Sequence, residues 1–256
     1  MFASFSDPVK LISNQGILFH PQGFSLSAYK KVFQNPSIYI GYGNTLFYVI
    51  AGTAMNIYAT ASAAYVLSRQ NLMLKKFFTL MFIFTMYFSG GLIPSYLLMD
   101  KLNLIDNRMG LIIPVAVSTY NLLIMITGFQ GISAALEESA RIDGAGSWTI
   151  LTRIIIPLAK PTIMVIMLYY AVGHWNAWFR AMIYIRDANK MPLQLLLRDI
   201  LTRSQLGAMG GNSDIEDVGT TIKYATILVS TVPILCIYPL IQKHFVQGVM
   251  IGAVKE

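Results

Sequence analysis

Residues 43–67 read GNTLFYVIAGTAMNIYATASAAYVL and lie within a stretch of 37 residues, 32–68, that contains no Asp, Glu, Lys or Arg. A helix of roughly 20 mostly apolar residues crosses the hydrocarbon core of a bilayer. The segment is also rich in Gly, Ala, Ser and Thr, and such small residues allow helix backbones to approach one another closely. The sequence therefore predicts a membrane-spanning helix over about 43–67 that packs against other helices on one side.

Four further charge-free stretches follow the first one. They contain 23, 28, 19 and 19 residues and cover 77–99, 109–136, 161–179 and 224–242. The spans that they predict cover about 77–98, 109–129, 161–181 and 222–241. Only 12% of the 256 residues are charged, about half the share found in ordinary soluble domains. We therefore expect an all-α, polytopic membrane protein with five visible spans, and we exclude a soluble enzyme, a disordered tail and a secreted disulfide scaffold.

The remaining bulk features narrow the class of protein. The formal net charge is +7, but the basic residues sit in short segments between apolar runs and form no continuous face, which favours the bilayer surface over nucleic acid as their partner. The single cysteine, Cys236, falls in the last apolar run, so an intrachain disulfide is impossible. Within the second span, Ser89-Gly90-Gly91 and Pro94 should weaken or kink the helix.

The chain divides into three expected regions. Residues 1–42 contain several turn signals and are too polar to span, so we expect an external or interfacial segment there. A transmembrane domain should cover 43–241, including a long polar interruption at 130–160. Residues 242–256 should form a tail. Counting Lys and Arg on the two sides gives a bias too weak to fix the orientation.

The interruption reads GISAALEESARIDGAGSWTILTRIIIPLAKP from 131 to 161. Ser133 is expected to cap a helix that ends at Gly144, and Ser147 to cap a second helix. That second helix would place Trp148, Leu151 and Ile155 on one face before Pro157 and Pro161 break it. Two short amphipathic helices joined by a glycine turn suit insertion into a groove of another protein. Physical reasoning alone leaves an interfacial helix pair on the bilayer equally open.

Fixed spacing in this loop favours the first interpretation. Glu138-Ser139-Ala140, then Gly144, then Ile154-x-Ile156-Pro157 resembles the EAA-loop signature of ABC-importer permeases at every point of its spacing. Ser139 replaces the first Ala of the signature and Ile156 replaces its Leu. The segment Asp143-Gly144-Ala145 is similar to the form found in sugar permeases.

The resemblance extends over essentially the whole chain and is to the carbohydrate branch of the maltose-transporter type. The other segments that carry it are Asn44-Thr45, Ala63-Ala64-Tyr65, Gly173-His174-Trp175-Asn176 with Trp178, Pro192-Leu193, and Gln247 to Lys255. The stretch Phe88-Ser89-Gly90-Gly91-Leu92-Ile93-Pro94 is similar to the subgroup for complex oligosaccharides and polysaccharide fragments. Permeases of that subgroup have six spans, so the resemblance implies that the first is missing from this chain.

The resemblance implies a function and a set of partners. The chain would be a transport subunit, not an enzyme, in the bacterial cytoplasmic (inner) membrane, and it would import sugars of oligosaccharide type with a companion permease and an external or periplasmic sugar-binding protein. Two cytoplasmic ATP-binding subunits would hold ATP and Mg, and this chain would hold no cofactor and no metal. The loop at 130–160 would dock into an ATPase cleft, with Glu138 pairing with a basic residue there and Trp148, Leu151 and Ile155 supplying buried anchors.

A second group of residues is expected along the sugar pathway. Sugars are held by aromatic faces and by side-chain hydrogen bonds, and the candidates are Tyr87, Tyr120, Asn121, Tyr170, His174, Trp175, Asn176 and Trp178. Aromatic residues also collect at membrane interfaces, so each one could be structural. His174-Trp175-Asn176 is the most informative group, because polar side chains inside a span need partners or a water-lined path. A structural hydrogen-bond cluster remains the alternative for these three.

Three rival functions are open to test. A stand-alone or ion-gradient-driven transporter should place ionisable residues in the middle of spans, and the charge-free stretches contain none. An intramembrane hydrolase would need paired carboxylates or clustered histidines, and the three histidines are far apart in the sequence. A membrane scaffold would also accommodate a protruding helix pair. Co-purification with an ATPase would distinguish an importer permease from these three alternatives.

Overall fold

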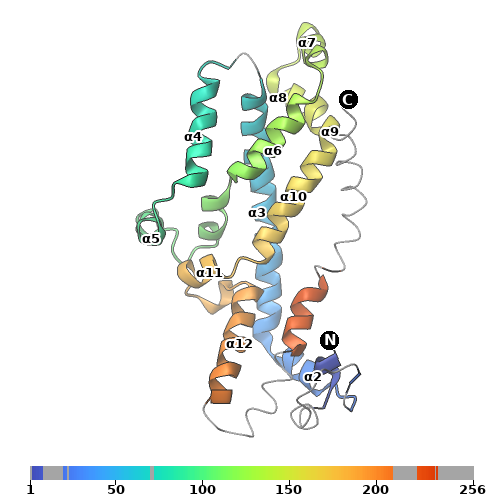
Figure 1. Cartoon of the computed structure of the whole chain (residues 1–256), viewed down its shortest axis with the longest axis vertical. Coiled ribbons are helices and arrows are strands. Elements are labelled where there is room, and N and C mark those ends of the chain that lie inside the picture. The colour runs from blue at the N-terminus through green and yellow to red at the C-terminus, as the bar shows by residue number, and fades with distance from the viewer. Residues whose placement is uncertain are drawn as a thin grey trace. The chain divides into compact units, whose positions relative to one another are not determined.

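The structure is a computed structural model that describes residues 2–7, 20–21, 23–69, 72–209, 224–233 and 235, with the side chains of 203–209 left out. The described part is helical and contains no strand, only an isolated bridge between Ser6 and Phe24 (Figure 1). Its α-helices are α2 Ser27–Gln34, α3 Pro36–Ser68, α4 Lys75–Tyr87, α5 Leu92–Lys101, α6 Thr119–Gln130, α7 Ala134–Ile142, α8 Ser147–Ile150, α9 Ile156–Leu158, α10 Lys160–Trp175, α11 Phe179–Tyr184, α12 Leu193–Met209 and the unlabelled helix Tyr224–Pro233. The other helical turns are η1 Phe2–Phe5, η2 Arg108–Leu111, η3 Ile113–Val115, the π-helical turn η4 Leu151–Ile155 and η5 Ala188–Lys190.

The described residues fall into two compact units. One contains residues from 2–46 and 175–235, and the other contains residues from 47–174. Each unit has its own apolar core, and α3 contributes residues to both. This confirms the all-α class.

The predicted spans are confirmed in part. In the described part, only α3 is long and apolar enough to cross a membrane as one helix. Three further helix pairs qualify together, and each is bent: α4 with α5 by 115°, residues 108–115 with α6 by 52°, and residues 147–158 with α10 by 87°. The helix Tyr224–Pro233 covers part of the fifth predicted span. The rest of 222–241, Cys236 and the tail 242–256 lie outside the described residues.

The observed helix ends confirm one prediction and correct others. The weakening predicted at Ser89-Gly90-Gly91 is confirmed, because the chain is extended at Phe88 and turns through Gly91, whose φ of +83° glycine adopts without strain. The predicted span 161–181 ends at Trp175, and α11 follows only after a break. Proline also acts differently from the expectation: Pro157 lies within α9, and the 87° bend falls at Ala159. Pro161 lies in the first turn of α10, where its missing N–H costs nothing.

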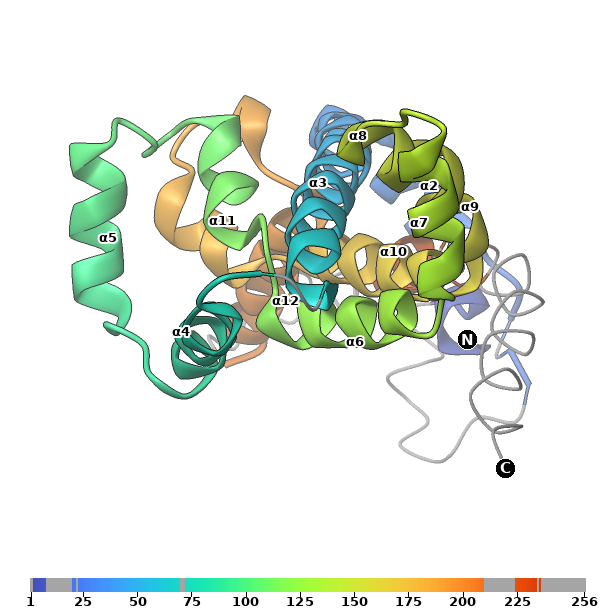
Figure 2. The same cartoon turned by 90° about the horizontal axis from the view of Figure 1, so that it is seen from above.

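Small residues bring α3 against α10 in the unit formed by residues 47–174. A Cβ atom added at Gly52 would lie 2.5 Å from Nε2 of His174, so this contact requires glycine. Further along α3, Ala61 and Ala64 are buried in the core with Phe129 of α6 and Ile166 of α10. This packing confirms the expectation that the small residues of 43–67 allow close helix contacts. Figure 2 shows α5 apart from α3 and α10 in the same unit.

Side chains of α3 and α10 satisfy the backbone where the bent pair at 108–130 is interrupted. Asn56 donates to the carbonyls of Val115 and Ala116, the second at 3.0 Å, and its Oδ1 lies 2.7 Å from Nε2 of His174. Unpaired backbone groups are costly in an apolar environment, and neighbouring side chains must therefore replace the missing helical bonds. Side chains of neighbouring helices therefore stabilise the interrupted helix.

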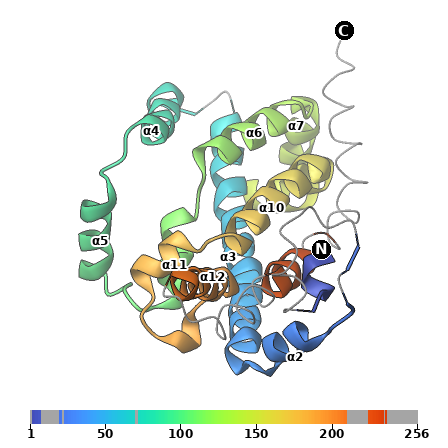
Figure 3. The same cartoon turned by 60° about the horizontal axis from the view of Figure 1, so that its bottom comes forward.

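The unit formed by 2–46 and 175–235 is held in a similar way. The Asn44 side chain donates to the carbonyls of Asn189 and Met191 at 2.7 and 3.1 Å, and the Thr45 hydroxyl accepts from the backbone N–H of Leu193 at 2.8 Å. Figure 3 shows α12 and the helix Tyr224–Pro233 near the N-terminal part of α3. The Asn44-Thr45 pair therefore fixes the start of α12 against α3.

Substitution of Tyr170 tests whether neighbouring side chains stabilise the interrupted helix at 108–130. Its hydroxyl lies 2.7 Å from Oγ1 of Thr60 and accepts from the backbone N–H of Ser118 at 2.9 Å. We expect Tyr170→Phe to lower the free energy of unfolding by about 1–2 kcal/mol, because it leaves a buried N–H and a buried hydroxyl unpaired. Tyr169→Phe is the matched control and should change it by less than about 0.5 kcal/mol, because Tyr169 is 41% exposed. Thermal denaturation of both variants in detergent makes the measurement, and equal losses would contradict the assignment.

Candidate functional site

The loop at 130–160 forms two short helices joined by a sharp turn. Helix α7 ends at Ile142, Gly144 has a φ of +84°, and α8 begins at Ser147. The backbone N–H of Gly144 donates to the carbonyl of Arg141 at 3.0 Å, and that of Ala145 donates to the carbonyl of Ala140 at 2.9 Å. Glycine adopts this left-handed conformation without strain, so the predicted helix end and glycine turn are confirmed.

The predicted capping serines are corrected. Ser133 precedes α7, but its side chain makes no capping hydrogen bond. Ser147 is the first residue of α8, and the capping position belongs to Gly146, whose carbonyl accepts from the N–H of Ile150 at 3.0 Å. The start of α8 is therefore marked by Gly146 without a side-chain cap.

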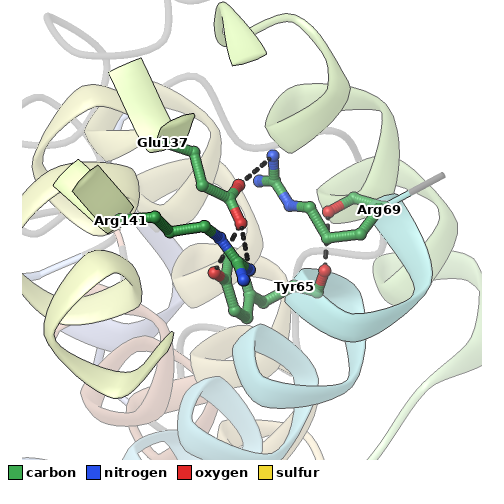
Figure 4. Close-up of polar contacts among 5 residues, drawn as sticks. Tyr65, Arg69, Glu137 and Arg141 are labelled. Atoms are coloured by element: carbon green, nitrogen blue, oxygen red, sulfur yellow. Dashed lines mark hydrogen bonds and ion pairs between the residues drawn. The ribbon is translucent and has the colours of Figure 1, made fainter. Parts of the chain in front are cut away.

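A buried carboxylate fastens α7 to the end of α3 (Figure 4). Oε2 of Glu137 lies 2.7 Å from Nη1 of Arg69. Its Oε1 accepts from Nη2 of Arg141 at 2.8 Å and from the Tyr65 hydroxyl at 3.0 Å. The Arg69 guanidinium also lies 4.9 Å from the centre of the Tyr65 ring. We call these four residues the Glu137 cluster.

The Glu137 cluster stabilises the ionised form of a carboxylate that is buried away from water. The Glu137 side chain is 8% exposed, and burial alone would raise its pKa. The hydrogen bonds from Arg141 and Tyr65 and the charge of Arg69 outweigh this effect and leave the pKa below the ordinary value of 4.5. Nε and Nη2 of Arg69 are buried without a hydrogen-bond partner in the described part of the chain. Arg69 therefore depends on Glu137 for its compensation.

The resemblance assigned the partner contact to Glu138, and Glu137 was expected to be solvated beside it, which the structure corrects. Glu137 points into the protein, whereas Glu138 is exposed. Successive residues of a helix point about 100° apart, so a buried Glu137 directs Glu138 outward. Both carboxylates border a groove of about 720 Å³ that is also lined by Arg69, Lys75 and Arg141. Glu138 is thus available to a partner, as the resemblance implied.

The expected apolar anchors need a correction. Leu151 and Ile155 are 3% and 1% exposed and belong to the apolar core of this chain. They cannot supply anchor area to a partner, because their own chain already covers them. Trp148 is 58% exposed, and its ring centre lies 6.0 Å from that of Tyr58 on α3.

Ile142 is an exposed apolar residue that sequence reasoning missed. It is 86% exposed at the last turn of α7, next to the glycine turn. Leu136 is 47% exposed on the same helix. Leu136, Ile142 and Trp148 are the three exposed large apolar side chains of the helix pair α7 and α8, and we refer to this set as the Trp148 ridge. The periodicity of 134–142 could have indicated Ile142, since it lies outside the face that holds Glu137 and Ala140.

The candidate pathway residues of the 47–174 unit divide by exposure. Asn121, Tyr170 and His174 are 5%, 7% and 5% exposed and lie within the protein. His174 and Tyr170 take part in the hydrogen bonds that support the helix interruption, which favours the structural alternative for both. Tyr87 and Tyr120 are 75% and 55% exposed, so they remain available to a ligand.

The pathway candidates of the other unit lie at the break after α10. Trp175 is 5% exposed, and its ring centre is 6.4 Å from that of Tyr42. Asn176 is exposed, and Trp178 is half-buried beneath the guanidinium of Arg198. The described residues contain no group of three or more His, Cys, Asp or Glu side chains that could hold a metal ion.

The two neighbouring glutamates provide a matched stability test. Glu137→Gln should lower the free energy of unfolding by about 2 kcal/mol or more, because it leaves the Arg69 charge uncompensated. Glu138→Gln makes the same chemical change on the exposed side of α7 and should cost less than about 0.5 kcal/mol. Thermal denaturation in detergent compares the two, and a larger loss for Glu138→Gln would overturn the assignment.

The Glu137 cluster also predicts a pH dependence. A carboxylate whose folded pKa is lowered contributes stability above its unfolded pKa, and this contribution is lost as the pH falls through the folded pKa. The advantage of the wild type over Glu137→Gln should therefore be complete at pH 7 and shrink below about pH 4.5. Melting temperatures of both proteins between pH 7 and pH 3 measure this difference. A constant difference across that range would show that Glu137 is not ionised in the folded protein.

Comparison with known proteins identifies the family to which the chain belongs. Residues 45–251 match the family described as "Binding-protein-dependent transport system inner membrane component". The chain is 40% identical to "Polygalacturonan/rhamnogalacturonan transport system permease protein YtcP" of Bacillus subtilis (strain 168), over 99% of this chain and 89% of that protein. It is also 40% identical to "Protein LplC" of the same organism, over 98% of this chain and 86% of that protein.

A solved structure is similar over nearly the whole chain. It is described as "Crystal structure of a bacterial ABC transporter involved in the import of the acidic polysaccharide alginate", and it matches with 33% identity and a TM-score of 0.86 over 95% of this chain and 87% of that chain. Together with the family match, this similarity confirms the resemblance on which the sequence analysis relied. The chain belongs to the binding-protein-dependent inner-membrane components, as a permease component of an ABC importer for sugars of oligosaccharide type.

Proposed function

We propose that residues 130–160 couple this permease to a cytoplasmic ATPase. The observation that carries the proposal is a protruding helix pair with an exposed apolar ridge and an exposed carboxylate, fastened to α3 by the Glu137 cluster. A helix pair of this kind suits a groove in a partner protein. In the proposed complex the Trp148 ridge enters the groove and Glu138 pairs with a basic side chain of the ATPase.

The proposed assembly contains several other proteins. A companion permease forms the other half of the translocation pathway, two ATP-binding subunits hold ATP and Mg, and an external sugar-binding protein delivers the substrate. This chain supplies no cofactor site. The 68–76 and 130–160 segments and the tail face the cytoplasm in this arrangement, and the segments before α3 and after α10 face outward. The apolar side chains of α4, none of which is buried, face lipid or the companion permease.

Movement of the ATPase is transmitted by two routes in this proposal. Through the Glu137 cluster, α7 is fastened to the cytoplasmic end of α3. Through the buried residues Leu151 and Ile155, the segment that leads from α8 into α10 is fixed in the core. Because both routes are stiff, displacement of the helix pair shifts helices of the 47–174 unit. ATP binding then changes the populations of inward-facing and outward-facing states.

Co-purification with an ATPase tests the coupling loop. The chain is co-expressed with its companion permease and a candidate sugar-importer ATPase, and the bound ATPase is quantified after purification. Glu138→Ala and Trp148→Ala should each reduce the retained ATPase about tenfold, because each removes an exposed contact residue. Tyr169→Phe should retain it fully. No retention by well-folded wild-type protein would favour a stand-alone transporter.

Two glycines of the turn provide a second test. Gly144 has a φ of +84°, whereas Gly146 has a φ of −71°, and a Cβ atom at either position would meet no other atom within 4 Å. Gly144→Ala should distort the turn at a cost of about 1–2 kcal/mol and weaken ATPase retention, and Gly146→Ala should leave retention unchanged. Equal retention by both variants would show that the angle between α7 and α8 is not needed for coupling.

A further inference from the structure

A second pocket, far from the coupling loop in sequence, lies within the unit formed by 2–46 and 175–235. Its volume is about 420 Å³, and its polar lining comes from Gln194 and Arg198 of α12 and from Thr226 and Ser230 of the helix Tyr224–Pro233. Trp178, a pathway candidate from the sequence, forms part of the wall. The pocket therefore combines an aromatic ring, a guanidinium, an amide and two hydroxyls.

Arg198 is held in place without being neutralised. Its Cζ lies 3.9 Å from the centre of the Trp178 ring, and its Nη1 donates to Sδ of Met182 at 2.7 Å. Among the described residues, no carboxylate lies within ion-pair distance of Arg198. Stacking on an indole restrains the guanidinium, and the in-plane N–H groups other than the one bonded to Met182 match the two oxygens of a carboxylate.

The hydroxyl of Thr226 is a second, independent sign of a ligand. Thr226 is 0% exposed, and its Oγ1 has no hydrogen-bond partner in the part of the chain that the structure describes. Buried polar atoms are almost always paired, so an unpaired hydroxyl in a pocket wall indicates a missing partner.

We infer that this pocket is a subsite for an acidic sugar, with Arg198 binding the carboxylate of a uronate residue. The inference rests on the proposed function and deepens it by naming the charge of the substrate. A site for neutral sugars would offer the open face of the indole, but here the guanidinium covers one face of Trp178. Charge recognition is therefore the chemistry that the pocket presents, with the Gln194 amide bonding a hydroxyl of the same sugar.

The position of the pocket along the chain suits an entry site. Residues 176–209 follow α10, so one membrane crossing separates α12 from the coupling loop, and the helix Tyr224–Pro233 begins the fifth predicted span from that same side. In the proposed orientation the pocket faces the side on which the binding protein delivers sugar. The solved relative is described as an importer of an acidic polysaccharide, which is consistent with a carboxylate-binding residue in this chain.

Uptake by the complete importer tests the subsite. The chain is reconstituted in vesicles with its companion permease, ATPases and binding protein, and the probes are trigalacturonate and its methyl ester, which lacks the negative charges. Arg198→Gln should raise the KM for trigalacturonate about tenfold with little change in kcat, because it removes charge-assisted hydrogen bonds to the ligand. Uptake of the methyl ester should not change. Arg198→Lys keeps the charge but cannot form two parallel hydrogen bonds, so its KM for trigalacturonate should lie between those of the wild type and Arg198→Gln.

Arg186→Gln is the control, because it removes the same charge from an exposed residue outside the pocket. It should leave the KM of both probes unchanged. An unchanged KM in Arg198→Gln, or an equal rise for both probes, would overturn the subsite while leaving the coupling proposal intact. If Arg198→Gln does not assemble into the importer, the same comparison of KM for the two probes is made with Arg198→Lys. A wild-type complex without ATP-dependent uptake of either probe would contradict the proposed function and the subsite together.

Discussion

The burial of one carboxylate constrains the rest of the loop between α6 and α10. A charge removed from water needs compensating partners, and Glu137 finds them in Arg69, Arg141 and Tyr65. This requirement fixes the rotation of α7 about its own axis. The same rotation turns Glu138 toward solvent, so the exposed carboxylate of the site is a geometric consequence of the buried one.

A second constraint acts inside the helix bundle of the same unit. Every backbone polar group in an apolar environment must be paired, so an interrupted helix is stable only where neighbours supply the missing bonds. Asn56 and Tyr170 do this for residues 115–118, and His174 orients Asn56 in turn. Polar side chains inside the expected spans therefore do not by themselves identify a sugar pathway. Their first role here is to make an irregular backbone possible.

The sequence allowed the class, the loop and its glycine turn to be predicted, because charge-free length and the tolerance of glycine are local properties. Spacing alone could not show what covers an apolar face. Leu151 and Ile155 have the right period for an exposed ridge, yet the core of their own chain covers them. The burial of Glu137 was not predicted for a related reason, since its partner Arg69 comes from a distant part of the sequence. The bend falls at Ala159, between Pro157 and Pro161. The sequence could not show at which of these residues the chain bends, because this depends on the packing around them.

Three arginines show how the same side chain serves structure or ligand according to its neighbours. Arg69 and Arg141 both contact Glu137, so each lies against a negative charge of its own chain. Arg198 is exposed, and it contacts an indole ring and a thioether, neither of which carries a charge. A guanidinium that is restrained and not neutralised retains its attraction for an anion. That difference separates a residue that joins two helices from one that can select a charged sugar.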